Sequence, residues 1–342
     1  MDKTITAQDV ADLAGVSRTT VSFVLNVEKR ESISEGTRQK VIDAIDQLGY
    51  VPNITAQALA SRSAKAIGLV MTRSPRYIAS DTFLPQIIGG LLDVVKKTNL
   101  SLLVEWVEAG EQITVYRKLI QAKHIDGMIL LTPREDDRGL KELASLEVPA
   151  VLMGTLTETN LSSVDLDNRA AAKMAVGHLL EQNHRRIACI TNAGISFSSA
   201  QERLLGYKDA LEEAGIVYDQ KLVRYADFDP QSGFACMQDL LEEDPDFTAV
   251  FVASDNVAMG ALSAIRAKGL QAPADLSVVG FDDIPWAKFA SPPLTTVHLP
   301  AQKLAKAACL LLLDLIKSDT VQIRHQRIES ELIVRDSTAQ LV

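Results

Sequence analysis

The sequence predicts a small all-α headpiece followed by a larger α/β core of two parallel-sheet lobes. The first fifty residues hold three short helical patterns with clear start and stop signals. From residue 66 onward, short apolar runs alternate with helical stretches. With 342 residues, of which 47% are apolar, the chain is long enough for two or three folding units. We assign the headpiece to residues 1–50, a hinge helix and linker to 51–65, and the core to 66–342.

Residues with capping side chains mark the beginning of each headpiece helix. Thr6, with Asp9 three residues later, has the pattern of a capped first helix. Gly15 follows this helix and suits a tight turn, because glycine adopts positive φ without strain. Ser17 and Ser34 are placed to cap a second and a third helix. Three short helices within fifty residues predict a helical bundle.

The first two helices have the spacing of a helix-turn-helix. Ala11, Gly15 and Val21 stand where that motif needs a small residue, a turn glycine and an apolar residue that fixes the helix crossing. A generic helical hairpin shares part of this pattern. The residues on the exposed face of the second helix, residues 18–25, therefore decide between DNA binding and a purely structural role.

That exposed face suits nucleic acid. Counting about 100° per residue from Val21 places Thr19 and Phe23 nearly opposite the apolar stripe, with Asn26 on its shoulder. Arg18 lies in the first turn and reaches far. Small hydroxyls, an amide and an arginine can contact phosphates and base edges. Phe23 either packs on another part of the headpiece or contacts a thymine methyl group in the major groove.

The distribution of charge permits DNA binding although the net charge is −9. Residues 1–65 hold eight Lys/Arg and eight Asp/Glu, so the whole excess of acid lies in the remainder. Within residues 13–27 the charged residue is Arg18 alone. A local surface can attract phosphate even on an acidic molecule, and the acidic core would limit non-specific binding.

A short segment after the bundle has helical composition. Pro52 cannot continue the third helix, and Asn53 can cap a new one. Residues 54–60 cover about two turns, which is too short for a stable helix alone in water. We expect this hinge helix to order against a partner or against DNA.

The core reads as two similar α/β lobes. Continuous apolar strands separated by helices indicate parallel sheets that are covered on both faces. The pattern restarts near residue 163, and a ligand cleft is expected at the strand ends between the lobes. The predicted strands are 67–71, 102–107, 127–131, 150–153, 187–191, 249–253 and 277–281, and the clearest helices are 84–97, 170–181, 200–214 and 257–267.

Several side chains are candidates for this cleft. Asp255 and Asp282 each follow a predicted strand, so both carboxylates are expected to face the crevice and accept from sugar hydroxyls. Arg203 begins a helical pattern after a strand and can donate to ligand oxygens in a fork. Phe228, in a strand-to-helix loop, can stack on a ring. The alternatives are helix caps and ion pairs for the charged residues, and core packing for the aromatic.

Composition and motifs argue against other classes of protein. No run approaches the roughly 20 apolar residues of a membrane helix, and the polar N-terminus lacks a secretory signal, so we expect a cytoplasmic protein. Five scattered histidines and three separate cysteines predict no metal site. Because neither G-x-x-x-x-G-K-[ST] nor G-x-S-x-G occurs, we expect no catalytic residues and no cofactor. A sugar receptor for a transporter is the remaining alternative.

Three segments carry a family resemblance: ITAQDVADLAGVSRTTVSFVLN, TRQKVIDAIDQLGYVPN and ITAQALASRSAKAIGLV. Over residues 4–70 the chain resembles the headpiece of the lactose repressor (LacI/GalR) family of bacterial transcriptional regulators. Some members have arginine in place of Phe23, so their operator sequence is not carried over. The resemblance implies base reading by Arg18, Thr19 and Phe23, phosphate contacts from Ser17, Thr20, Asn26 and Ser34, and hinge-helix contacts from Asn53, Ala56 and a minor-groove wedge, Leu59.

The core carries the same resemblance in VDLDNRAAAKMAVGHLL, ERLLGYKDALEEAGI, VFVASDNVAMGALSAIRAKG and LSVVGFDDIPWAKFASPPLTTV. The family core is similar to periplasmic sugar-binding proteins, with three crossovers between lobes. That implies one lobe from residues 66–162 plus 295–320 and the other from 163–294 plus 321–340. Ser254 departs from a frequent asparagine, which weakens any transfer of ligand identity. Effector contacts are implied for Phe83, Leu84, Arg203, Phe228 and Asp282.

The resemblance also predicts partners. A single headpiece is too small to hold a DNA site tightly, so we expect a homodimer on a pseudo-palindromic operator. The chain ends at Val342, soon after the last core segment, without the leucine-heptad tail of tetrameric members. We expect a repressor that a sugar releases from double-stranded DNA. The alternative is a regulator with a purine or phosphorylated metabolite as corepressor.

Overall fold

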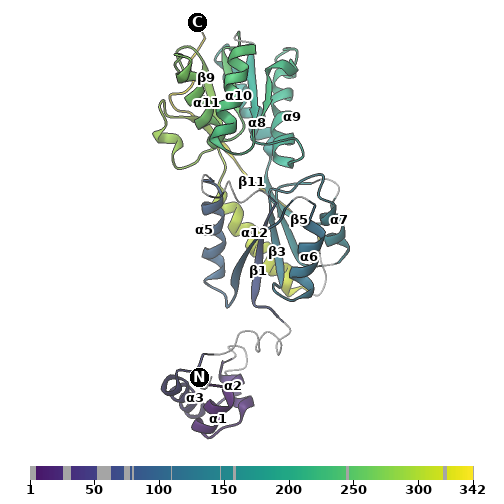
Figure 1. Cartoon of the computed structure of the whole chain (residues 1–342), viewed down its shortest axis with the longest axis vertical. Helices are drawn as coiled ribbons and strands as arrows, with labels where there is room; N and C mark the ends of the chain where they lie inside the picture. Colours follow the sequence, from purple (N-terminus) through teal and green to yellow (C-terminus); the bar gives the residue numbers. More distant parts are fainter. Residues whose placement is uncertain are drawn as a thin grey trace. The chain divides into compact units, whose positions relative to one another are not determined.

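The computed structural model describes residues 5–25, 32–51, 63–72, 78, 81–108, 110–146, 148–156, 159–243, 246–318 and 322–341. The chain divides into two compact units, Met1–Ala64 and Lys65–Val342 (Figure 1). Four predicted DNA contacts, Asn26, Asn53, Ala56 and Leu59, lie outside the described residues. Within the described residues, no helix combines the length and apolar character needed to cross a bilayer.

The headpiece has the three expected helices, α1 (Ala7–Ala14), α2 (Arg18–Leu25) and α3 (Glu35–Leu48). The predicted first cap is present, because the amide of Thr6 donates to the Asp9 carboxylate at 2.9 Å and the Asp9 amide donates to the Thr6 hydroxyl at 3.4 Å. Gly15 ends α1 with a φ of 66°. The helices pack through a small apolar core, which is made of Val10, Ala11, Val21, Val24, Val41 and Ala44.

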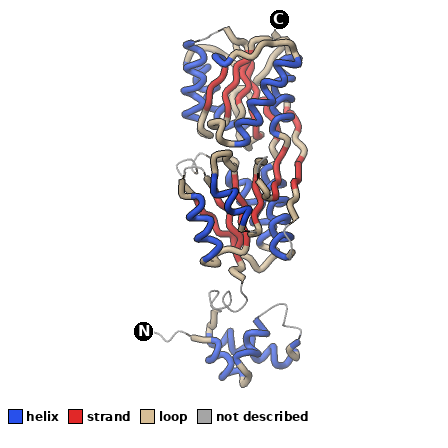
Figure 2. Tube along the Cα trace, turned by 90° about the vertical axis from the view of Figure 1, so that its right-hand side faces the viewer, coloured by secondary structure: helices blue, strands red, loops and turns tan. Residues whose placement is uncertain are grey.

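Lobe one of the core is a six-stranded parallel sheet in the order β11-β5-β4-β3-β1-β2. Helices cover both faces, with α5 and α12 on one side and α6 and α7 on the other (Figures 1 and 2). The strands are β1 (Ala66–Met71), β2 (Ser101–Trp106), β3 (Gly127–Leu131), β4 (Ala150–Met153), β5 (Ser162–Leu166) and β11 (His325–Ile328), and the helices are α5 (Leu84–Val95), α6 (Gln112–Gln121), α7 (Arg138–Ser145) and α12 (Ala301–Lys317).

Lobe two repeats this architecture with the strand order β12-β10-β9-β8-β6-β7. Its strands are parallel except for β12, which pairs antiparallel with β10. Helices α8 and α9 cover one face, and α10 and α11 cover the other. The strands are β6 (Ile187–Thr191), β7 (Val223–Tyr225), β8 (Ala249–Val252), β9 (Ser277–Asp282), β10 (Thr295–His298) and β12 (Glu331–Ile333), and the helices are α8 (Asn168–Glu181), α9 (Ser198–Glu213), α10 (Pro230–Glu243) and α11 (Asp255–Ala267).

The chain crosses between the lobes three times, as the resemblance implies, but at different residues. The first crossing follows β5 at Leu166 rather than residue 162, because β5 pairs with β4. Residues 295–298 belong to lobe two, since β10 pairs with β9. Residues 325–328 belong to lobe one, since β11 pairs with β5. The predicted lobe boundaries are corrected accordingly.

Candidate functional site

A cavity lies between the two lobes, where the carboxyl ends of both parallel sheets meet. In lobe two, four neighbouring strands each lead into a residue of the cavity wall. Asp282 ends β9, Ser254 follows β8, Asn192 follows β6 and Phe228 follows β7. Ligand sites form at this edge of a parallel sheet because successive strand ends bring loop residues together there. The strand order β9-β8-β6-β7 therefore builds this wall directly.

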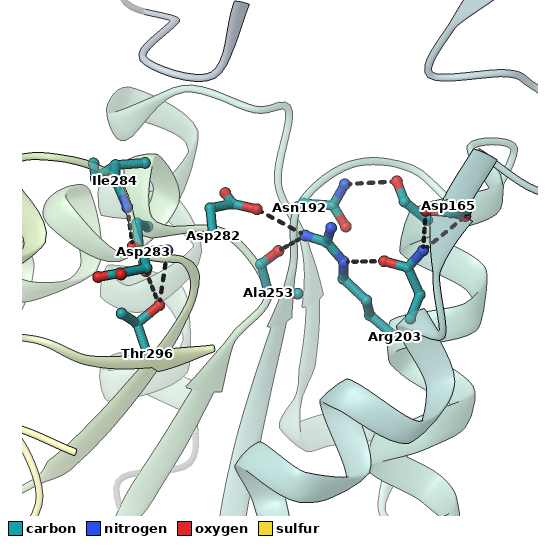
Figure 3. Close-up of polar contacts among 11 residues, drawn as sticks. Asp165, Asn192, Arg203, Ala253, Asp282, Asp283, Ile284 and Thr296 are labelled. Atoms are coloured by element: carbon teal, nitrogen blue, oxygen red, sulfur yellow. Dashed lines mark hydrogen bonds and ion pairs between the residues drawn. The ribbon is translucent and has the colours of Figure 1, made fainter. Parts of the chain in front are cut away.

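Arg203 anchors the polar network of lobe two (Figure 3). It lies on α9, is 5% exposed, and donates from Nε to Asn168 Oδ1 at 2.9 Å. Its Nη1 donates to the Ala253 carbonyl at 2.7 Å and pairs with Asp282 Oδ1 at 3.4 Å. Its guanidinium also lies 3.7 Å from the centroid of the Phe281 ring. A buried charge needs such partners, because leaving one unpaired is costly.

Asp282 is held from several sides. Besides Arg203, the side chain of Ser254 and the backbone amide of Asp255 favour the ionised form of its carboxyl and lower its pKa. Burial raises the pKa of the Asp282 carboxyl, and Arg203 opposes this rise. A carboxylate fixed in this way keeps a defined orientation towards the cavity.

Asp255, a predicted effector contact, does not line the cavity. Strand β8 already ends at Val252, so Ser254 takes the strand-end position and Asp255 begins α11. Its fully buried carboxylate accepts from the Thr296 hydroxyl at 2.7 Å and from the Ile284 amide at 3.0 Å. Burial, with Asp282 close by, raises the pKa of Asp255 well above its usual range. The residue ties the turn after β9 to α11.

Lobe one contributes a mainly apolar wall, with two carboxylates. The apolar members are Phe83, Leu131, Met153, Val164, Leu166 and Leu304. Asp81 and Asp165 also line the cavity. The Asp165 carboxylate accepts from Asn168 Nδ2 at 3.0 and 3.1 Å, and burial raises its pKa to about 6. Leu84, another predicted contact, is 3% exposed and packs into the lobe core at the start of α5, outside the cavity wall.

Contacts between the lobes border the cavity. The Glu135 amide of lobe one donates to the Ser196 carbonyl of lobe two at 2.8 Å. The guanidinium of Arg134 lies 4.8 Å from the ring centroid of Phe197, which in turn meets the cavity residue Phe228 edge-on at 5.0 Å. Phe228 therefore joins the wall of the cavity to a contact between the lobes.

The headpiece presents its predicted contacts on α2 and α3. Arg18 and Thr19 are exposed, and Phe23 is half-buried beside them. Ser17 accepts from the Thr20 amide at 3.1 Å and so caps α2. Ser34 precedes α3 but makes no side-chain cap, since its hydroxyl donates to Thr37 Oγ1 at 2.9 Å.

Some cavity residues were not predicted. Asn192 is the first residue after β6, so it has the same strand-end signal as Asp282 but on an uncharged side chain. Asp165 lies inside β5, a strand whose sequence SSVDL has no continuous apolar run. Asn168 begins α8 and points back to Arg203. Among the described residues, no cluster of histidine, cysteine or carboxylate side chains could hold a metal ion.

A helix-turn-helix unit on the same chain as a two-lobed core with a polar cavity defines a class of protein, the ligand-responsive DNA-binding regulators. Family models support both parts. Residues 6–53 match the model for bacterial regulatory proteins of the lacI family, and residues 176–338 match a periplasmic binding protein-like domain.

Comparisons over the full length identify the family. The HTH-type transcriptional regulator CelR of Thermobifida fusca is 36% identical over 335 residues, covering 97% of this chain and 98% of the relative. The repressor PurR of Actinobacillus pleuropneumoniae serotype 3 is 34% identical over 340 residues, covering 98% and 99%. The chain belongs to the lacI family of bacterial regulatory proteins, and it is a DNA-binding transcriptional regulator.

Solved structures agree with this fold. A CelR–cellobiose complex matches with a TM-score of 0.76 and 35% identity, covering 97% of this chain and 99% of that one. The Lac repressor dimer, bound to operator and the anti-inducer ONPF, matches with a TM-score of 0.86 and 31% identity, covering 98% and 100%.

Proposed function

We propose that this regulator represses transcription as a homodimer bound to a pseudo-palindromic operator, and that a neutral sugar in the cavity between the lobes releases it. The charged residues of the cavity wall are the observation from which we infer the class of effector. Among the described residues of its wall, three are carboxylates, Asp81, Asp165 and Asp282, and one is a cation, Arg203. That cation is already engaged by Asp282, Asn168 and a backbone carbonyl.

A phosphorylated effector fits this wall poorly. A phosphoryl group carries about −1.5 to −2 charges at neutral pH. It would meet the carboxylates of the wall, whose described part offers no cation beyond the engaged Arg203. Vicinal hydroxyls of a sugar can donate to carboxylates, and the faces of Phe83 and Phe228 can pack on a sugar ring. The complex of the relative CelR with cellobiose supports the same ligand class. The cavity thus favours a sugar over a phosphorylated corepressor.

Exposed apolar side chains support a dimer of the core. Trp286 is 61% exposed and Phe289 is 70% exposed on lobe two, and Trp106 is 41% exposed on β2 at the edge of the lobe-one sheet. Exposed aromatic groups and open sheet edges are typical of contact surfaces. Sedimentation equilibrium tests this proposal, because Trp286→Ser should weaken self-association, and an unchanged dissociation constant would remove Trp286 from the interface.

DNA release follows from a shift between lobe arrangements. A ligand changes operator affinity by as much as its affinity differs between the two arrangements. The cavity is shared between the lobes, so ligand contacts depend on how the lobes are arranged.

We place base reading on the exposed start of α2, at Arg18 and Thr19. As a regulator of DNA, the protein is proposed to act in the cytoplasm.

One titration tests the effector class. The full chain is bound to a labelled operator duplex selected from random DNA, and fluorescence anisotropy is followed while cellobiose, glucose, galactose, glucose 6-phosphate or hypoxanthine is added. We expect at least one neutral sugar to release the DNA and the phosphate ester to have no effect. Release by glucose 6-phosphate alone, or tighter binding with hypoxanthine, would overturn the sugar-inducer proposal.

A further inference from the structure

Asn192 has one end of its amide unpaired inside the ligand cavity. The residue is 3% exposed, follows β6 directly and lines the cavity. Its Nδ2 donates to the Ser199 hydroxyl at 3.1 Å. Within the described part of the chain, its buried Oδ1 has no hydrogen-bond partner. Buried polar atoms are nearly always paired in native proteins, so an unpaired one calls for a functional explanation.

The nitrogen end of the Asn192 amide is the paired end, because Nδ2 donates to the Ser199 hydroxyl and Oδ1 is left without a donor. Asn168, in the same cavity, differs in this respect. Its Nδ2 donates to Asp165 at 3.0 Å and its Oδ1 accepts from Arg203 at 2.9 Å, so both ends are paired within the protein.

We propose that Asn192 is a specificity-determining residue, whose unpaired amide oxygen accepts a hydrogen bond from a ligand hydroxyl. This inference rests on the proposed sugar-binding function. It extends the polar wall of lobe two from Arg203 on α9 and Asp282 at the end of β9 to the end of β6. An ionised phosphate or carboxylate has acceptors only, so it cannot satisfy the Asn192 oxygen.

Such a residue affects the stability of the ligand-free protein and the stability of the complex in opposite directions. Its unpaired atom destabilises the ligand-free protein and stabilises the complex, because the missing partner arrives with the ligand. Asn192→Leu keeps the branched shape and removes the polar atoms. The substitution removes the unpaired oxygen together with one hydrogen bond to the half-buried Ser199 hydroxyl, so the ligand-free melting temperature should change little, while sugar affinity should fall by about tenfold. Asn168→Leu breaks paired contacts, so it should lower the melting temperature.

The experiment uses the full chain and five probes: glucose, galactose, cellobiose, maltose and lactose. The sugar that raises the wild-type melting temperature most is then titrated calorimetrically into wild type, Asn192→Leu, Asn192→Ala and Asn168→Leu. The alanine variant tests the same loss if leucine prevents folding. Weaker binding without loss of ligand-free stability in either Asn192 variant supports the proposal.

Two results would overturn it. One is unchanged sugar affinity in the Asn192 variants. The other is a loss of ligand-free stability in both that matches Asn168→Leu, because that result marks a structural role. If none of the five sugars stabilises the wild-type protein, the proposed sugar function fails, and the role of Asn192 fails with it. The wild-type measurement therefore separates the two failures.

Discussion

The two lobes of the core have the same architecture but contribute different chemistry to the shared cavity. Each is a six-stranded sheet covered by helices on both faces. At the strand ends of lobe two lie three polar side chains: Ser254, Asp282, which pairs with Arg203, and Asn192, which donates to Ser199. At the strand ends of lobe one lie mainly apolar side chains such as Met153 and Leu131.

This difference indicates that lobe two recognises the ligand and that lobe one covers it. Lobe two holds Arg203 and Asp282 by hydrogen bonds that are already formed, so their orientation costs little when a ligand binds. Lobe one offers apolar surface that gains stability when it covers a sugar ring. We infer that lobe two selects the ligand and that the fit of lobe one depends on the lobe arrangement. Substitutions in each lobe test that division.

The largest effect is expected at Asp282. Asp282→Ala leaves the buried Arg203 without its ion-pair partner and removes an acceptor from the cavity. Truncating one member of such a pair costs about 2–5 kcal/mol, so sugar affinity should fall about a hundredfold or more. Calorimetric titration measures the affinity, and the thermal melt reports the accompanying loss of stability.

Asp283→Ala is the matched control. Asp283 pairs with Arg335 at 2.7 Å and His298 at 2.9 Å and does not line the cavity. This variant should lose stability and keep its affinity for sugar. Equal affinity losses in the two variants would show that Asp282 acts only through the fold.

A smaller effect is expected at Asp165, the buried carboxyl of lobe one. Burial raises its pKa from 3.8 to about 6, so the folded state binds the proton more tightly than the unfolded state. Its contribution to stability is fully present below about pH 4 and is lost as the pH rises through 6. Relative to Asp165→Asn, the wild type should therefore lose roughly 1–3 kcal/mol of unfolding free energy between pH 4 and pH 8.

Urea unfolding of both proteins across this pH range measures the effect. Other titrating groups, among them His178 and His184, cancel in the comparison because both proteins contain them. The hydrogen bonds that asparagine cannot reproduce shift the variant by a constant amount. A stability difference that does not change with pH would show that folding does not raise the pKa of the Asp165 carboxyl.

The sequence predicts the elements whose pattern is set by burial. Apolar runs such as Gly127–Leu131 and Ile187–Thr191 are strands at the predicted positions, because their side chains are buried on both faces. The missed strands have polar sequences, among them SSVDL in β5 and HQRI in β11. These strands lie next to each other at one edge of lobe one, where β11 is largely exposed. The lobe boundaries were misplaced for the same reason.

The site is predictable where a charge or ring directly follows a strand. Asp282 and Phe228 lie in the cavity wall by this logic, whereas Arg203 reaches the wall from within α9. The placement of Asp255 depended on where β8 ends, since one residue separates a strand-end position from the first turn of a helix. The unpaired end of the Asn192 amide is a property of its surroundings. A sequence does not reveal such a property, because it requires knowing every neighbouring donor.

The smallest effects are expected at the two cavity aromatics, one from each lobe. Phe228→Leu removes a ligand-facing ring and its edge-on contact with Phe197, worth about 0.5–1.5 kcal/mol, so both sugar affinity and stability should fall. Phe83 has no ring partner in the described part of the chain, so Phe83→Leu should reduce sugar affinity by a similar few-fold at a smaller loss of stability. Titration calorimetry and urea midpoints separate the two quantities. If Phe83→Leu proves as destabilising as Phe228→Leu, the contact between Phe228 and Phe197 adds nothing beyond ordinary packing. The aromatic residue of lobe two would then be held no more firmly than that of lobe one.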